Sequence, residues 1–189
     1  MRNVKLFSFL LIAATVAGVA CKEKEAPAPD VQTSPEAAIT AVVKADKIKP
    51  GYARKPTYFK LPSTNGGEID LASYAGKSVL VMFFTETCPY CRKAAPFIEK
   101  MHKTYSPKGL SVVGICIQEN ADAPKTFASD LNITFPLAYK GGHVYKNYKA
   151  QGVPFIYLLG KNHEIREVWE GYSPEYNQEI IRNIEEALK

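Results

Sequence analysis

Residues 83–97 read FFTETCPYCRKAAPF and contain two of the four cysteines of this chain, Cys88 and Cys91. The pair follows the apolar run SVLVMFF at 78–84, which is typical of a strand buried on both faces. It precedes the stretch 89–104, whose apolar residues recur at helical spacing. The sequence therefore predicts a C-x-x-C motif where a buried strand passes into a helix. A metal clip, a structural disulfide and a redox couple all use this spacing.

A cysteine at the start of a helix lies in surroundings that favour its thiolate. Unpaired backbone N–H groups and the helix macrodipole stabilise negative charge there, so we expect a lowered pKa for the Cys88 thiol. The thiolate is the nucleophile of disulfide exchange. Cys91 lies nearly one helical turn further on, close enough to pair with Cys88. We assign Cys88 as the attacking thiol and Cys91 as the resolving thiol, with Pro89 at the first helical position.

The other two uses of the motif need different partners. A zinc site needs four ligands, usually a second C-x-x-C or a paired histidine. The candidates that remain are Cys116 and three scattered histidines that we expect at the surface, His102, His143 and His163. The sequence thus indicates no metal site and no cofactor. An inert structural disulfide is the plain alternative. We interpret Cys116 as a core thiol, with a regulatory or resolving role as its alternative.

A second motif is GVPFIYLL at 152–159, in which Pro154 directly precedes an apolar run. In a chain that also carries a strand-to-helix C-x-x-C, this predicts a cis peptide bond between Val153 and Pro154, since cis prolines are uncommon and usually tied to a site. The alternative is an ordinary proline at the first position of a strand.

The N-terminus carries export signals. MRNVK is a short basic segment, and the apolar stretch 6–20 is shorter than the ~18 residues of a spanning helix, which fits a secretory signal peptide. The segment GVAC at 18–21 resembles a bacterial lipobox, with glycine where leucine is usual. We predict a signal peptide at 1–20 and a lipidated N-terminal Cys21. Cleavage after Ala20 without lipidation, or an uncleaved short anchor, are the alternatives.

The remaining chain divides into two parts. Residues 21–53 are rich in Ala, Pro, Lys and Glu and predict a flexible tether. Residues 54–189 predict one globular domain, in keeping with 46% hydrophobic and 23% charged residues in the whole chain. The net charge of +5 is a mild excess spread along the chain, so we expect no nucleic-acid partner. Export would place the cysteines in an oxidising compartment.

The pattern of the domain predicts an α/β fold with a central mixed sheet and helices on both faces. A hairpin turns at Asn65-Gly66-Gly67. The expected strands are 78–84, 110–117, 134–139, 154–160 and 164–171, the last two antiparallel. The expected helices are 89–104, 123–131, 143–151 and a terminal helix capped by Ser173, with Pro174 at its first position.

At this point the chain resembles the thioredoxin superfamily, and in particular its TlpA/ResA-like membrane-anchored branch, over residues 54–189. The resemblance rests on VLVMFFTETCPYCRKAAP with Pro96, on YKAQGVP with Tyr148, on the GKNHEI turn and on an insertion around 118–140. It implies a thioredoxin-like fold with a central insertion and a thiol–disulfide oxidoreductase activity. It also implies that cis-Pro154 packs against a Cys88–Cys91 disulfide and that the Val153 backbone bonds a substrate strand.

Three positions depart from the family pattern. Met82 stands where thioredoxins have a buried aspartate, Thr87 where they have tryptophan, and Ala94 where many reductive members have glutamate. A carboxylate near the resolving thiol can accept its proton. Glu86 is the nearest carboxylate along the sequence and is our candidate for that role. A solvated loop carboxylate is its alternative.

The dipeptide between the cysteines, Pro89-Tyr90, is the one usual in glutaredoxins, whose reduction potentials are intermediate. We therefore expect a monomeric, lipid-anchored, periplasm-facing oxidoreductase that reduces selected protein disulfides, with cytochrome c maturation as one option. A membrane thiol-electron carrier would supply its electrons.

Two other functions stay open. A peroxiredoxin is suggested by Thr85, which matches part of P-x-x-x-T-x-x-C, although Val81 occupies the proline position. A copper-binding metallochaperone would use C-x-x-x-C and a distant histidine, and the spacing here is shorter.

Overall fold

The computed structural model describes residues 51–189. The predicted signal peptide at 1–20, Cys21 and nearly all of the predicted tether lie outside the described residues. Within 51–189, no helix combines the length and the apolar character needed to cross a membrane.

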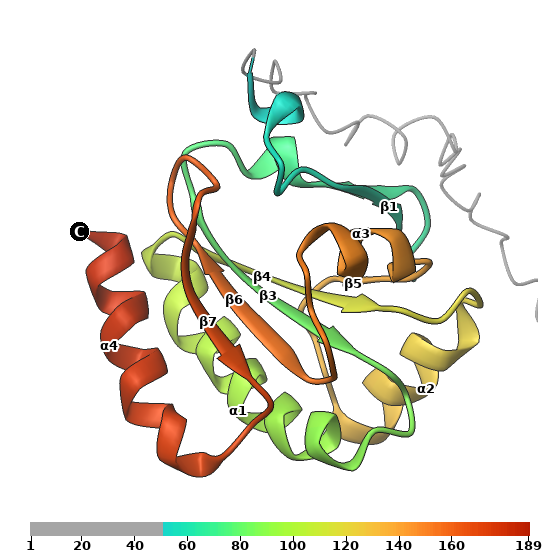
Figure 1. The fold of residues 1–189 in the computed structure, drawn as a ribbon. Coiled ribbons are helices and arrows are strands. Elements are labelled where there is room, and N and C mark those ends of the chain that lie inside the picture. Colours follow the sequence, from blue (N-terminus) through green and yellow to red (C-terminus); the bar gives the residue numbers. More distant parts are fainter. Residues whose placement is uncertain (1–50) are drawn as a thin grey trace, which may run out of the picture. The chain divides into compact units, whose positions relative to one another are not determined.

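The core of the domain is a mixed sheet of strand order β5-β4-β3-β6-β7 (Figure 1). Strand β3 at its centre pairs parallel with β4, and β4 pairs parallel with β5. On the other side β3 pairs antiparallel with β6, and β6 with β7. The strands are β3 (Ser78–Phe84), β4 (Leu110–Cys116), β5 (Leu137–Ala138), β6 (Phe155–Leu159) and β7 (Ile165–Glu170).

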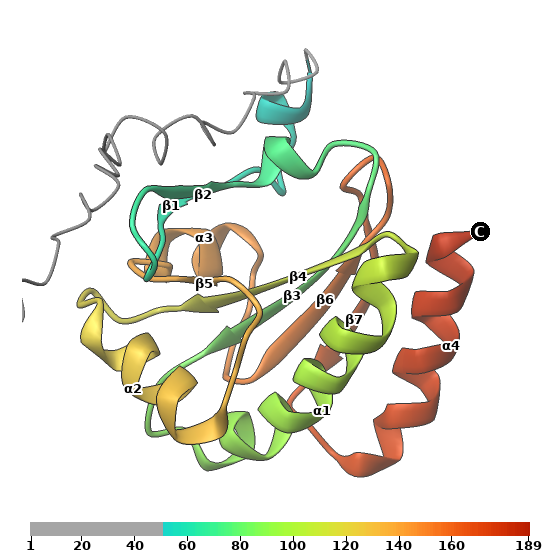
Figure 2. The same ribbon diagram turned by 180° about the vertical axis from the view of Figure 1, so that it is seen from behind.

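The two faces of the sheet carry different covers. Helices α1 (Pro89–Tyr105), α2 (Asp122–Leu131) and α4 (Asn177–Leu188) pack on one face. The short helix α3 (Gly142–Asn147) and a hairpin of β1 (Lys60–Pro62) and β2 (Glu68–Asp70) cover the other (Figures 1 and 2). Four 3₁₀ turns complete the described chain: Tyr52–Arg54, Leu71–Tyr74, Ser106–Lys108 and Pro174–Tyr176. The predicted α/β class and thioredoxin-like architecture are confirmed, and α2 and β5 form the central insertion.

Strand β3 is buried along its whole length because its side chains alternate between these two covers. Leu80, Met82 and Phe84 belong to the cluster under α1, α2 and α4. Val79, Val81 and Phe83 belong to the cluster under the hairpin and α3. The carboxyl end of β3 is therefore held from both sides, and the residues that follow it start from a fixed point.

Three local expectations are corrected. The terminal α-helix begins at Asn177, because residues 174–176 form a 3₁₀ turn whose Glu175 N–H bonds the Ser173 hydroxyl at 3.4 Å. Helix α3 ends at Asn147, four residues earlier than expected.

His163 is the third correction, since it is buried and not at the surface. Its Nε2 lies 3.1 Å from the Tyr74 carbonyl oxygen, and burial lowers the pKa of its imidazole. The turn at 160–163 folds over the hairpin side of the sheet, which sequence position alone did not reveal.

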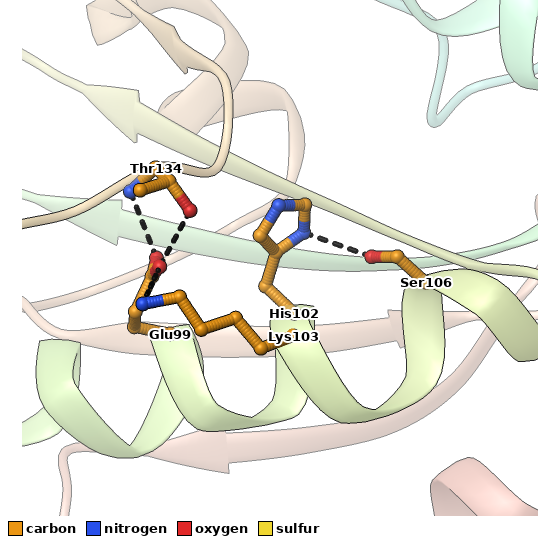
Figure 3. A network of polar contacts seen from close by, with 5 residues as sticks. All are labelled: Glu99, His102, Lys103, Ser106 and Thr134. Carbon is orange, nitrogen blue, oxygen red and sulfur yellow. Dashed lines mark hydrogen bonds and ion pairs between the residues drawn. The ribbon is translucent and has the colours of Figure 1, made fainter.

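A buried carboxylate in α1 ties this helix to the segment before β5 (Figure 3). Glu99 accepts the Thr134 N–H at 2.9 Å and the Thr134 hydroxyl at 2.5 Å, and the Lys103 ammonium lies 3.0 Å away. Burial alone would raise the pKa of Glu99, but the bonds from Thr134 and Lys103 outweigh it and lower that pKa. In the same view His102 Nδ1 lies 2.9 Å from the Ser106 hydroxyl oxygen.

We expect Glu99→Gln to destabilise the domain at neutral pH by about 2 kcal/mol, the usual loss for hydrogen bonds to a charged group. The folded-state pKa of Glu99 lies below its unfolded value, so its contribution is present above the unfolded pKa and disappears as the pH falls through the folded pKa. Urea unfolding between pH 7 and pH 3 tests this: the gap between wild type and Glu99→Gln should narrow in acid. Glu186→Gln, an exposed change in α4, is the control. A gap independent of pH would contradict the assignment.

Candidate active site

The two cysteines of the C-x-x-C motif lie at the N-terminus of α1. Cys88 is the N-cap residue with extended backbone, and its Sγ accepts the Cys91 N–H at 3.1 Å. Cys88 and Cys91 form a disulfide with their Cα atoms 5.2 Å apart. Cys88 is partly exposed, whereas the Cys91 side chain is completely buried. An incoming disulfide can therefore reach only one of the two sulfurs.

A loop from a distant part of the chain borders the exposed sulfur. The peptide bond between Val153 and Pro154 is cis, as the sequence predicts. The Val153 carbonyl oxygen lies 3.5 Å from Cys88 Sγ. The Pro154 carbonyl accepts the Gly171 N–H at 2.8 Å, which joins this loop to the end of β7. The fold thus brings the second sequence motif directly against the first.

The loop between β3 and α1 is held by a residue that the sequence did not single out. Gln118 Oε1 accepts the Glu86 N–H at 2.8 Å and lies 3.6 Å from Cys116 Sγ. On the other side, Arg92 Nη1 donates to the Glu86 carbonyl at 3.4 Å. Gln118 follows β4, whose carboxyl end lies beside that of β3. The signal that could have found it is this position, because ligand-facing residues gather where parallel strands end.

The resolving cysteine is surrounded by apolar side chains. Met82 and Ala94, which stand where related proteins carry carboxylates, are both fully buried in the cluster that contains Cys91. The backbone of Glu86 makes the contacts described above, and its carboxylate is one cause of the raised pKa of Cys116. A role of Glu86 as proton acceptor for Cys91 stays a prediction.

The third cysteine of the domain, Cys116, is a free and buried thiol at the end of β4. Burial is the main cause that raises the pKa of its thiol to about 11. It therefore stays protonated at neutral pH and is a poor nucleophile. Both its burial and its protonation favour the interpretation of Cys116 as a packing residue.

We expect iodoacetamide to alkylate Cys88 in the reduced native protein while Cys116 stays unmodified for at least ~100 times longer, because reactivity follows thiolate content and exposure. Mass spectrometry of tryptic peptides over time measures both rates, and labelling in urea is the control in which Cys116 must react. Equal rates in the folded protein would assign Cys116 to the reactive site.

A groove of about 280 Å³ opens where Tyr90 of the C-x-x-C motif meets the cis-proline loop. Eight residues line it, and three of them are tyrosines: Tyr90, Tyr172, Tyr176, Glu170, Gly171, Ser173, Val153 and Pro154. The groove thus reaches from the C-x-x-C motif across the loop to the segment after β7. Within residues 51–189, the groove included, no group of three or more His, Cys, Asp or Glu side chains is arranged to hold a metal ion.

Comparisons with known proteins agree with this geometry. The model of the AhpC/TSA family matches residues 53–168. The thiol-disulfide oxidoreductase ResA of Bacillus thuringiensis subsp. konkukian is 27% identical over 143 residues, which are 75% of this chain and 82% of ResA.

Two solved structures share the fold. A thiol:disulfide interchange protein of the thioredoxin family from Chlorobium tepidum superposes with a TM-score of 0.61 at 22% identity, covering 70% of this chain and 94% of its own. A secreted Mycobacterium tuberculosis disulfide oxidoreductase, homologous to E. coli DsbE, gives 0.60 at 20% identity, covering 69% of this chain and 97% of its own.

A partly exposed sulfur at a helix N-terminus, a buried partner and a cis-proline loop are the parts that dithiol exchange requires. Together with the family match, they define the class of the protein. The chain belongs to the AhpC/TSA family of the thioredoxin superfamily, and it is a thiol–disulfide oxidoreductase of the ResA type.

Proposed function

We propose that this chain reduces selected protein disulfides outside the cytoplasm, with Cys88 as the attacking thiol and Cys91 as the resolving thiol. The observation that carries the proposal is the asymmetry of the pair. Cys88 is partly exposed at the N-terminus of α1, and Cys91 is buried beneath it. A substrate thiol bound to Cys88 would lie within reach of Cys91 but shielded from most other thiols.

The reaction proceeds in two exchanges. The Cys88 thiolate attacks one sulfur of the substrate disulfide, whose S–S bond breaks, and the leaving substrate thiolate takes a proton from water. Cys91 then loses its proton and attacks Cys88 Sγ, which breaks the mixed disulfide and releases the second substrate thiolate. The substrate disulfide becomes two thiols, and the protein dithiol becomes the Cys88–Cys91 disulfide.

The neighbouring residues have separate roles in this scheme. The Cys91 N–H, 3.1 Å from Cys88 Sγ, stabilises the thiolate. Pro89 occupies the first helical position, where its missing N–H costs the helix no hydrogen bond. Val153 and Pro154 present backbone to the substrate, and Tyr90 forms a wall of the groove. Glu86 would accept the proton of Cys91.

The location of the protein follows from its N-terminal sequence. A lipidated Cys21 would anchor the chain to the membrane, residues 21–53 would act as a tether, and residues 54–189 would face the periplasm as a monomer. An oxidising compartment would keep the disulfide closed, so a membrane thiol-electron carrier must re-reduce it. Apocytochrome c is one substrate to test among extracytoplasmic protein disulfides.

Two measurements test the proposal, the first on the full-length, detergent-solubilised protein and the second in cells. The first is the reduction potential of the Cys88–Cys91 couple, read by thiol alkylation after equilibration in glutathione or dithiothreitol buffers. A value at or below about −230 mV supports a reductant, whereas a value near about −120 mV would reverse the direction of electron flow.

The second measurement is substrate trapping. Cys91→Ser should accumulate dithiothreitol-sensitive mixed disulfides with extracytoplasmic proteins in cells, and Cys88→Ser should not. Incorporation of radioactive palmitate that disappears in Cys21→Ala tests the anchor independently of the redox chemistry.

A further inference from the structure

The groove where Tyr90 meets the cis-proline loop has a lining of an unusual kind. Three tyrosine rings, Tyr90, Tyr172 and Tyr176, share it with the carboxylate-bearing Glu170. No lysine, arginine or histidine lines this groove. The segment 170–179, EGYSPEYNQE, which forms one side, contains three glutamates and no basic residue. Tyrosine and glutamate are residue types that recognise an organic cation, through the aromatic ring and the negative charge.

Part of this lining is held in place before any ligand arrives. The Tyr172 hydroxyl donates to Asn177 Oδ1 at 3.0 Å, and its ring lies 6.1 Å from the Phe97 ring between centroids. Glu170 ends β7 in register with Phe155, the residue after Pro154. A cation in the groove would therefore meet a Tyr172 ring that is already positioned, which limits the entropy lost on binding.

The protein itself already places a cation on one of these rings. Lys93 Nζ lies 5.3 Å from the ring centroid of Tyr90, whose side chain is exposed. Lys93 is not part of the groove lining. A substrate cation would make the same kind of contact with Tyr90 from inside the groove. There the negative charge of Glu170 would add an ion pair, which the contact between Lys93 and Tyr90 does not include.

We propose that the groove is a subsite for a lysine or arginine side chain next to the target cysteine of the substrate, so that the protein selects disulfides with basic flanks. This inference rests on the proposed reductase function. The selection is local, because the whole chain carries a net charge of +5, which acts against cationic substrates at long range. Near Cys88, the attraction of the groove for a cation would thus exceed the long-range repulsion from the net positive charge of the protein.

The probe is a set of peptides Gly-X-Cys-X-Gly whose cysteine is held in a disulfide with thionitrobenzoate, with X as lysine, norleucine or glutamate. The Cys88 thiolate attacks the peptide sulfur, the mixed disulfide breaks, and the coloured thionitrobenzoate leaves. Each second-order rate constant for the reduced full-length protein is divided by that for 2-mercaptoethanol, which removes intrinsic differences between the peptides. Because X stands on both sides of the cysteine, one X side chain can reach the groove in either direction of peptide binding.

We expect the lysine peptide to react about tenfold faster than the norleucine peptide, as one ion pair and one cation–π contact would give, and the glutamate peptide to react slowest. Glu170→Gln should reduce the lysine-to-norleucine ratio to about threefold or less, while Glu175→Gln, on the same segment but outside the groove, should keep it. Tyr176→Leu should also reduce the ratio. High salt should shrink the preference in wild type.

The outcomes separate the subsite from the function. Equal normalised rates for the lysine and norleucine peptides in an active protein would overturn the subsite and leave the reductase standing. A lysine-to-norleucine ratio that stays unchanged in Glu170→Gln would likewise overturn the subsite and leave the reductase standing. An unchanged ratio in Tyr176→Leu would overturn the aromatic part of the proposal. Thionitrobenzoate release no faster than in Cys88→Ser, with every peptide, would overturn the reductase function and the subsite with it.

Discussion

Cys88→Ser is expected to abolish disulfide reduction at neutral pH, lowering kcat/KM by at least ~10³-fold. The reason is that a serine hydroxyl is a much weaker nucleophile than a thiolate and cannot form a disulfide. The loss is so large because Cys88 holds the only sulfur of the pair that is partly exposed. The measurement is the reduction of a protein disulfide by the pre-reduced protein, followed by alkylation of the new thiols.

The matched control is Cys116→Ser, which replaces the other cysteine of the domain with the same side chain. Cys116 is buried and its thiol is protonated, so this variant should reduce the substrate at the wild-type rate, provided that it folds. Far-ultraviolet circular dichroism spectra of both variants would verify folding. Substantial activity in Cys88→Ser would move the attacking role to Cys91 and contradict the roles assigned to the pair.

Phe83→Ala is expected to lower the free energy of unfolding by about 3–5 kcal/mol, a large part of the ~5–15 kcal/mol that stabilises a domain. Phe83 is fully buried in β3, and its ring makes edge-to-face contacts with Tyr148, Tyr157 and Tyr145 at centroid distances of 5.3, 5.8 and 5.8 Å. Removing the ring leaves a cavity between the sheet and α3. Urea unfolding, with the midpoint and slope fitted together, measures the loss.

Phe97→Ala deletes the same atoms from a partly buried site on α1 and is the comparison. It should cost about 1 kcal/mol, because less apolar area leaves contact with the core. Equal losses in the two variants would mean that the aromatic cluster around Phe83 contributes no more than surface packing. A changed slope in Phe83→Ala would indicate instead a change in the compactness of the unfolded or folded state, or a loss of two-state unfolding.

The order of strands and helices was readable because it depends on local signals. Residues 79–84 are apolar without interruption, and a short run of this kind, rich in β-branched and aromatic residues, is typical of a strand covered on both faces. The alternating and helical segments that follow were placed within a few residues of their observed bounds. Errors fell where two local structures compete, as at 174–176, where a proline next to Ser173 starts a 3₁₀ turn as readily as an α-helix.

The burial of polar residues was not readable in this way. Glu99 lies on α1 at a position that sequence reasoning passed over, and its partner Thr134 is 35 residues away. His163 lies in a turn, which usually means exposure, yet it is covered by Tyr52 and by the Tyr74 carbonyl. Both depend on segments that meet only when the sheet and its two covers have assembled.

The sequence by itself determined the class of fold and the C-x-x-C motif at a strand-to-helix junction, because both follow from patterns of neighbouring residues. It also predicted the cis bond before Pro154, from that proline taken together with the C-x-x-C motif. Only the tertiary structure decided which residues surround the sulfurs. It placed the Val153 carbonyl 3.5 Å from Cys88, brought Gln118 under the Glu86 loop and closed a tyrosine-lined groove with residues after β7. The physical reason is that burial and contact across 30 to 80 residues of chain are set by the packing of whole elements, which local propensity does not encode.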